Sequence, residues 1–101
     1  MSTVKVTMPT GHTLRVLEHR ARAHDFATWE ADALGAICAV IRPGSVVFDV
    51  GAEEGEFSAL YGLIAGPENV HMFEPPPAVW PNIRAARAAT HSPPQAGASA
   101  R

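Results

Sequence analysis

The fold is decided by residues 45–74, which begin with the apolar run Ser45-Val46-Val47-Phe48-Asp49-Val50. A short apolar run bounded by turn residues is typical of a strand buried on both faces, as in a parallel sheet. A glycine-containing loop, 51–55, leads into helical apolar spacing over 56–65, and a second short apolar run follows at 69–74. Strand, helix and strand within 30 residues have the size of one βαβ unit. The segment therefore predicts an α/β fold in which two parallel strands end at the same edge.

Other elements are predicted on both sides of this unit. Residues 4–8 and 13–17 alternate apolar and polar side chains around a Pro-Thr-Gly-His turn, which predicts a β-hairpin. Apolar residues at helical spacing from Thr28 to the Pro43-Gly44 pair predict a helix with Thr28 as its N-cap. A partial helix is expected from about residue 78. Three regions are expected: a hairpin with its connector over 1–27, the α/β region over 28–87, and a disordered tail over 88–101.

Composition and charge exclude several classes of protein. Of the 101 residues, 47% are apolar and 18% are charged, as in an ordinary soluble domain, and no apolar run has the length of a membrane helix. The single cysteine, Cys38, and the lack of a signal sequence favour the cytoplasm. Residues 43–83 hold six acidic residues and no lysine or arginine, so their net charge is −6. Such a segment repels nucleic acid.

The loop after the first strand fits one of three kinds of nucleotide site. A dinucleotide fingerprint that starts at Gly51 requires glycine at positions 53 and 56, but these are Glu53 and Glu56. A phosphate-binding P-loop requires a lysine, but the sequence has no lysine after Lys5. S-adenosylmethionine carries no phosphate and has a sulfonium, an ammonium and a ribose diol. The negative charge of an acidic glycine loop favours the sulfonium and the ammonium. Glu74 lies 23 residues after Gly51, which is the spacing of a strand-end acid that accepts hydrogen bonds from ribose hydroxyls.

The sequence Asp-Val-Gly-Ala-Glu-Glu-Gly-Glu-Phe-Ser at 49–58, followed by Phe-Glu-Pro-Pro-Pro at 73–77, resembles the FkbM family of S-adenosylmethionine-dependent methyltransferases. The resemblance covers residues 42–84. It implies the N-terminal portion of a Rossmann-like methyltransferase fold and O-methyl transfer to a small-molecule or glycan acceptor. Carried over by position, it implies that the cofactor contacts Asp49, Gly51, Ala52, Glu53, Gly55, Ser58, Glu74 and Pro75. No catalytic residue is implied, because the family continues for about as many residues again, with further strands and the acceptor site.

Structural alternatives accompany these assignments. A chain that carries only this portion is also consistent with a non-catalytic remnant or interaction fragment, which would self-associate through an open sheet edge. Glu54 and Glu56 are expected to form a solvated helix start, and Trp29 and Trp80 to be core anchors. Cys38 is expected to be a small buried apolar side chain and His71 a packing residue. No spacing of histidines and acids predicts a metal site.

Overall fold

The N-terminal hairpin is confirmed in the computed structural model, which describes residues 2–51, 55–74 and 77–91. Strands β1 (Thr3–Thr7) and β2 (Thr13–Leu17) pair antiparallel, with Val4 opposite Val16. Gly11 adopts a positive φ of 87° in the turn, a conformation that glycine adopts without strain. The alternation predicted from the sequence places Leu14 and Val16 in the core.

Two helices connect the hairpin to the rest of the chain, and each differs from the prediction. Helix α1 (Glu18–Ala23) was not predicted, because its residues are almost all polar or alanine. Helix α2 (Ala31–Val40) begins three residues after Thr28, so Thr28 is not its N-cap. Asp25 organises a turn instead: its carbonyl accepts from the Trp29 N–H at 2.9 Å and its carboxylate accepts from the Ala27 N–H at 3.2 Å. This turn uses the residues that the sequence pattern assigned to the first helical turn.

The strand–helix–strand prediction for the central segment is confirmed. Strand β3 (Val47–Val50) is followed by helix α3 (Glu56–Ala65), and a short 3₁₀ turn, η1 (Pro67–Asn69), precedes strand β4 (Val70–Phe73). β3 and β4 pair in parallel, with Val47 opposite Val70 and Val50 opposite Phe73. The chain is thus a mixed α/β protein with two small two-stranded sheets, one of them parallel.

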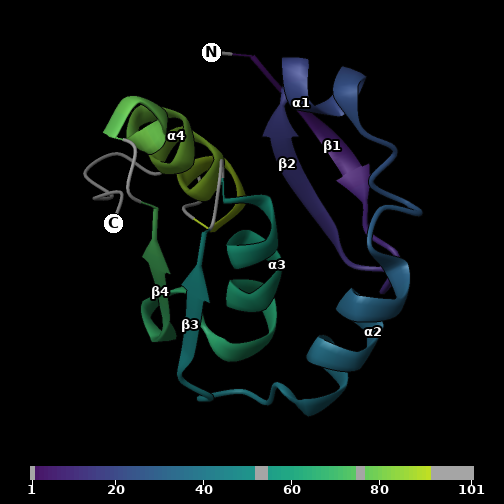
Figure 1. Cartoon of the computed structure of the whole chain (residues 1–101), viewed down its shortest axis with the longest axis vertical. Helices are drawn as coiled ribbons and strands as arrows, with labels where there is room; N and C mark the ends of the chain where they lie inside the picture. The colour runs from purple at the N-terminus through teal and green to yellow at the C-terminus, as the bar shows by residue number, and fades with distance from the viewer. Residues whose placement is uncertain (1, 52–54, 75–76, 92–101) are drawn as a thin grey trace.

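Helix α4 (Trp80–His91) follows a second 3₁₀ turn, η2 (Pro77–Val79), and packs against α3 and β2 (Figure 1). The sequence predicts a disordered tail from residue 88, but the helix continues to His91. Thr90 explains the extension, since its hydroxyl accepts from the Arg15 N–H at 3.3 Å and donates to the Arg15 carbonyl at 3.2 Å. These bonds tie the last turn of α4 to the hairpin. Residues 92–101 of the predicted tail lie outside the described residues.

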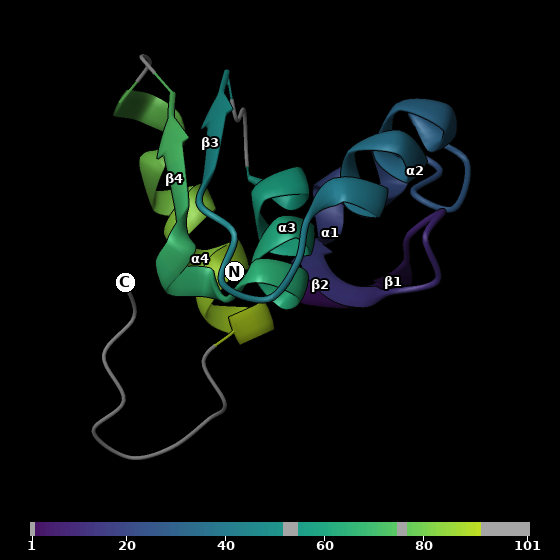
Figure 2. The same cartoon turned by 90° about the horizontal axis from the view of Figure 1, so that it is seen from below.

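Helices α3 and α4 cover the same face of the β3–β4 sheet. Asp49 and Met72 are opposite one another in the sheet register; Asp49 contacts Ser58 of α3, and Met72 lies beside Ile83 of α4. The hairpin lies beyond these helices, as the two views show (Figures 1 and 2). The core therefore lies between the hairpin, α2, α3 and the inner face of β3–β4, and is formed by Met8, Leu14, Val16, Phe26, Leu34, Ala59, Leu60, Tyr61 and Val70.

Among the described residues, no element covers the opposite face of the β3–β4 sheet, which corrects the prediction that these strands are buried on both sides. This outer face is formed by the exposed side chains of Val46, Phe48, Val50, His71 and Phe73. Phe48 is 66% exposed and Val50 is 80% exposed. An apolar run in sequence cannot distinguish one covered face from two, because that depends on which elements pack against the sheet. His71, predicted as a packing residue, lies on this face with its ring 5.4 Å from that of Phe48.

Candidate functional site

The carboxyl ends of β3 and β4 meet at one edge, as the sequence predicts. The Gly51 N–H, just after β3, donates to the Phe73 carbonyl at the end of β4, with an N–O distance of 2.8 Å. Glu74 follows Phe73 directly, so the loop after β3 and the acid after β4 start side by side. Parallel α/β sheets bind ligands at such edges.

Asp49 and Ser58 are brought together by the packing of α3 on the sheet. The Ser58 hydroxyl donates to Asp49 Oδ2 at 2.5 Å, a short charge-assisted bond, and Ser58 is buried. The carboxylate also lies near Tyr61: burial first, and then the negative charges of Asp49 and Cys38, raise the pKa of Tyr61 to about 12. The bond to Ser58 fixes Asp49 against the first turns of α3.

Two glycines lie on either side of residues 52–54, between β3 and α3. Gly51 and Gly55 have φ values of 75° and 86°, in the left-handed region that side chains disfavour. Gly55 is buried, and a Cβ atom there would lie 3.3 Å from both Ile83 Cγ2 and Met72 Sδ. It therefore allows α3 to begin close to β4 and α4. Three of the predicted cofactor contacts, Ala52, Glu53 and Pro75, lie outside the described residues, as does Glu54.

A hollow of about 250 Å³ opens beside the end of β4. Its lining is formed by Met72, Glu74, Trp80, Ile83 and Arg84. The Trp80 indole N–H donates to the Glu74 carbonyl at 2.8 Å, yet the side chain is 43% exposed. The prediction that Trp80 is a core anchor is therefore wrong. Trp29, in contrast, is partly buried and packs against the core.

Glu56 is buried at the start of α3, which corrects its assignment to a solvated helix start. Only 4% of its side chain is exposed, and both carboxylate oxygens accept from Arg20 of α1, at 2.9 and 3.2 Å. The charge pattern gave no indication of this pair, because the partners are 36 residues apart. Cys38, predicted to be buried, is half-buried against the core, and burial raises the pKa of its thiol.

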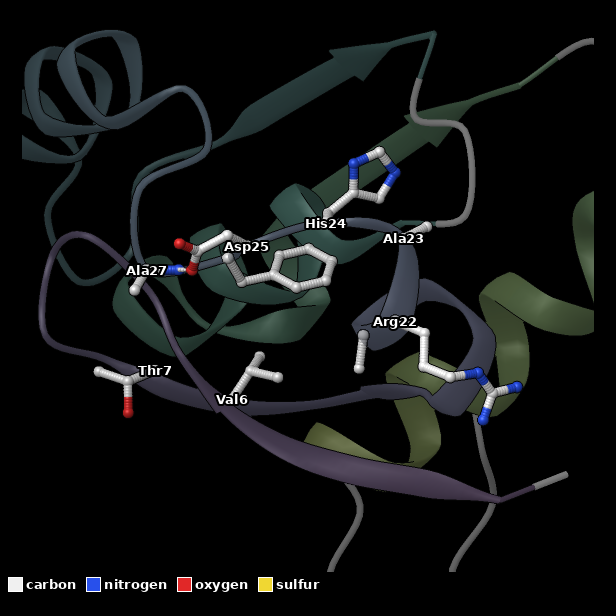
Figure 3. Close-up of a pocket in the computed structure, with 9 residues that line it drawn as sticks. Val6, Thr7, Arg22, Ala23, His24, Asp25 and Ala27 are labelled. Carbon is white, nitrogen blue, oxygen red and sulfur yellow. Dashed lines mark hydrogen bonds between the residues drawn. The ribbon is translucent and has the colours of Figure 1, made fainter.

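A larger hollow of about 530 Å³ lies between β1 and the segment that follows α1 (Figure 3). No residue of the predicted cofactor site lines it. Three of its polar side chains make contacts with other residues: Arg22 pairs with Glu18 at 3.1 Å, His24 stacks on Trp29 with ring centroids 4.0 Å apart, and the Asp25 carboxylate accepts from the Ala27 N–H.

Over 2–51, 55–74 and 77–91, no group of three or more histidine, cysteine, aspartate or glutamate side chains is arranged to hold a metal ion. Within the same residues, no helix combines the length and apolar character needed to span a bilayer.

The chain was compared with models of known protein families, with curated proteins and with solved structures. None of the three comparisons found a match.

Proposed function

We propose that this chain is the cofactor-binding, N-terminal portion of a Rossmann-like, S-adenosylmethionine-dependent methyltransferase similar to the FkbM family. One observation carries the proposal: the Gly51–Phe73 hydrogen bond joins the two strand ends, so the glycine loop and Glu74 share one edge. In parallel α/β sheets this edge holds nucleotides. The acceptor would be a small molecule or a glycan.

The residues at this edge fit the chemistry of the cofactor. S-adenosylmethionine supplies a methyl group on a cationic sulfonium when it is bound. Glu74 offers a carboxylate that can accept from both hydroxyls of a ribose. Asp49 adds negative charge near the glycine loop, where a cationic methionine portion is favoured. The hollow of about 250 Å³ is smaller than the roughly 300–1,000 Å³ of complete ligand pockets, so it suits only part of the ligand.

Calorimetric titration with S-adenosylmethionine or S-adenosylhomocysteine tests this proposal. We expect saturable heat from chain that circular dichroism shows to be folded. Glu74→Ala should weaken binding by about tenfold or more, the loss expected for a charge-assisted pair of hydrogen bonds. Glu68→Ala is the matched control, because Glu68 is an exposed acid at the opposite end of β4. No heat at millimolar ligand from folded protein would refute the proposal.

A second candidate function, an interaction module, is favoured by the bare outer face of the β3–β4 sheet. The occupant we propose for this face is a second copy of the chain. Although residues 43–83 carry a net charge of −6, the outer face includes no carboxylate, lysine or arginine among its five residues. Two copies can therefore approach without bringing like charges together. The open edge of the same short sheet would extend the contact by strand pairing.

Sedimentation velocity over a range of concentrations tests the interaction module. We expect a dimer that Phe48→Lys disrupts, since the substitution places a cation in the apolar face. Val40→Lys is the control, because Val40 is 75% exposed on α2, away from this sheet. A monomer at every concentration, or equal dissociation by both variants, would exclude the outer face as a self-association surface.

A further inference from the structure

We infer that Trp80 forms the stacking surface for the purine base of the ligand and so determines specificity for a purine nucleoside. The inference rests on the proposed function, because it concerns the same hollow at the end of β4. It goes further in assigning a base-binding role to a residue outside both sequence motifs.

Trp80 is held in place although it is exposed. Its indole N–H donates to the Glu74 carbonyl at 2.8 Å, which ties the ring to the strand end that carries the acid. At the same time 43% of the residue is exposed, at the first turn of α4. An aromatic ring that is fixed by its polar atom and open on its surface offers contact area at little cost in conformational entropy.

The neighbours of Trp80 favour a flat, uncharged group. Met72 and Ile83 contribute apolar surface to the hollow, and Glu74 contributes a carboxylate at its side. A purine base has an apolar face for the ring, and the ribose attached to it has hydroxyls for the acid. Base–aromatic stacking is favourable for every base and increases with ring size, so a purine has the larger contact.

Arg84 determines which end of the ligand lies in the hollow. It lies one helical turn after Trp80 and lines the same hollow. Its positive charge repels a sulfonium or an ammonium, whereas it tolerates a neutral base. The cationic portion of the cofactor is therefore expected on the side of Asp49 and Gly51, and the base on the side of Trp80.

Fluorescence isolates this contact. The chain has two tryptophans, so Trp29→Phe leaves Trp80 as the sole indole emitter. Trp29 packs in the core, and phenylalanine keeps an aromatic ring there. We expect adenosine to change the Trp80 emission saturably, and uridine to require about tenfold more ligand for the same change.

Calorimetry on the otherwise unaltered chain provides the independent test. Trp80→Leu should weaken adenosine and S-adenosylmethionine by about tenfold, and Trp80→Phe by less. If the chain binds S-adenosylmethionine but Trp80→Leu leaves the affinity unchanged, the stacking assignment is wrong and the proposed function stands. If folded chain binds neither ligand, the proposed function fails and the inference fails with it.

Discussion

Arg20 of α1 donates two hydrogen bonds to the buried carboxylate of Glu56 at the start of α3. The bidentate geometry satisfies both carboxylate oxygens, and the guanidinium also lies 5.9 Å from the Trp29 ring centroid. The pair joins the connector after the hairpin to the helix that carries Ser58. Glu56, which the sequence predicts to be solvated, therefore joins α1 to α3 inside the protein.

Removal of this arginine should be costly. Arg20→Ala leaves the Glu56 carboxylate buried without its partner, and such a change costs about 3–5 kcal/mol. Urea unfolding of the variant measures it. Arg22→Ala is the matched control, because Arg22 and Glu18 form an exposed pair on the same helix and should contribute about 0–1 kcal/mol. Equal losses in both variants would contradict the structural role of Arg20.

Gly55 should not tolerate a side chain. Gly55→Ala forces a left-handed φ on alanine and brings its Cβ to 3.3 Å from Ile83 and Met72. We expect a loss of about 1–3 kcal/mol in the free energy of unfolding. Gly35→Ala, in the interior of α2 with open space around it, should instead stabilise the protein by about 0.5–1 kcal/mol. Thermal unfolding distinguishes the two signs directly.

Two leucines of α3 should differ sharply in their contribution to stability. Leu60 is fully buried, whereas Leu63, one turn further along, is 41% exposed. Leu60→Ala should cost about 2–5 kcal/mol, because it removes apolar contacts and leaves a cavity. For Leu63→Ala we expect a loss below about 1 kcal/mol. Comparable losses measured by urea unfolding would show that α3 does not bury the face described here.

His91 should make stability depend on pH. Burial chiefly, and the charge of Arg87 next, lower the pKa of His91, while a backbone hydrogen bond with Ala59 opposes them. The unfolded chain therefore binds the proton more readily, and the stability that neutral His91 contributes is complete above about pH 6.5. This stability is lost as the pH falls from about 6.5 towards the pKa of His91 in the folded protein. His91→Gln should flatten this part of the pH profile; an unchanged profile would assign it to other groups.

The sequence predicted the parts of the fold that local pattern controls. Alternation located the hairpin, and the two apolar runs located β3 and β4 together with the edge where Gly51 and Glu74 lie. The pattern failed where distant residues decide the outcome. Glu56 is buried because Arg20 reaches it, and α4 extends to His91 because Thr90 bonds to the hairpin.

The candidate site divides in the same way. Asp49, Gly51 and Ser58 were predicted from the loop motif, and the structure brings Asp49 and Ser58 into contact. The exposure of Trp80 was not predicted, because an aromatic residue in an apolar pattern is typical of a core. Its exposure depends on where η2 and the start of α4 place the ring. The closeness of Trp80 and Glu74 in the sequence, where they are six residues apart, was the signal available for this contact.

The hydrogen bonds between Thr90 and Arg15 also bear on the order of folding. They join residues separated by 75 positions, and contacts of such long range form only after the intervening chain has been brought into place. During synthesis the hairpin leaves the ribosome before α4, the helix that packs against β2. The part of β2 that α4 covers therefore stays exposed until α4 has been made, whereas the core side chains Leu14 and Val16 pack against residues of α2 and α3 that are made earlier.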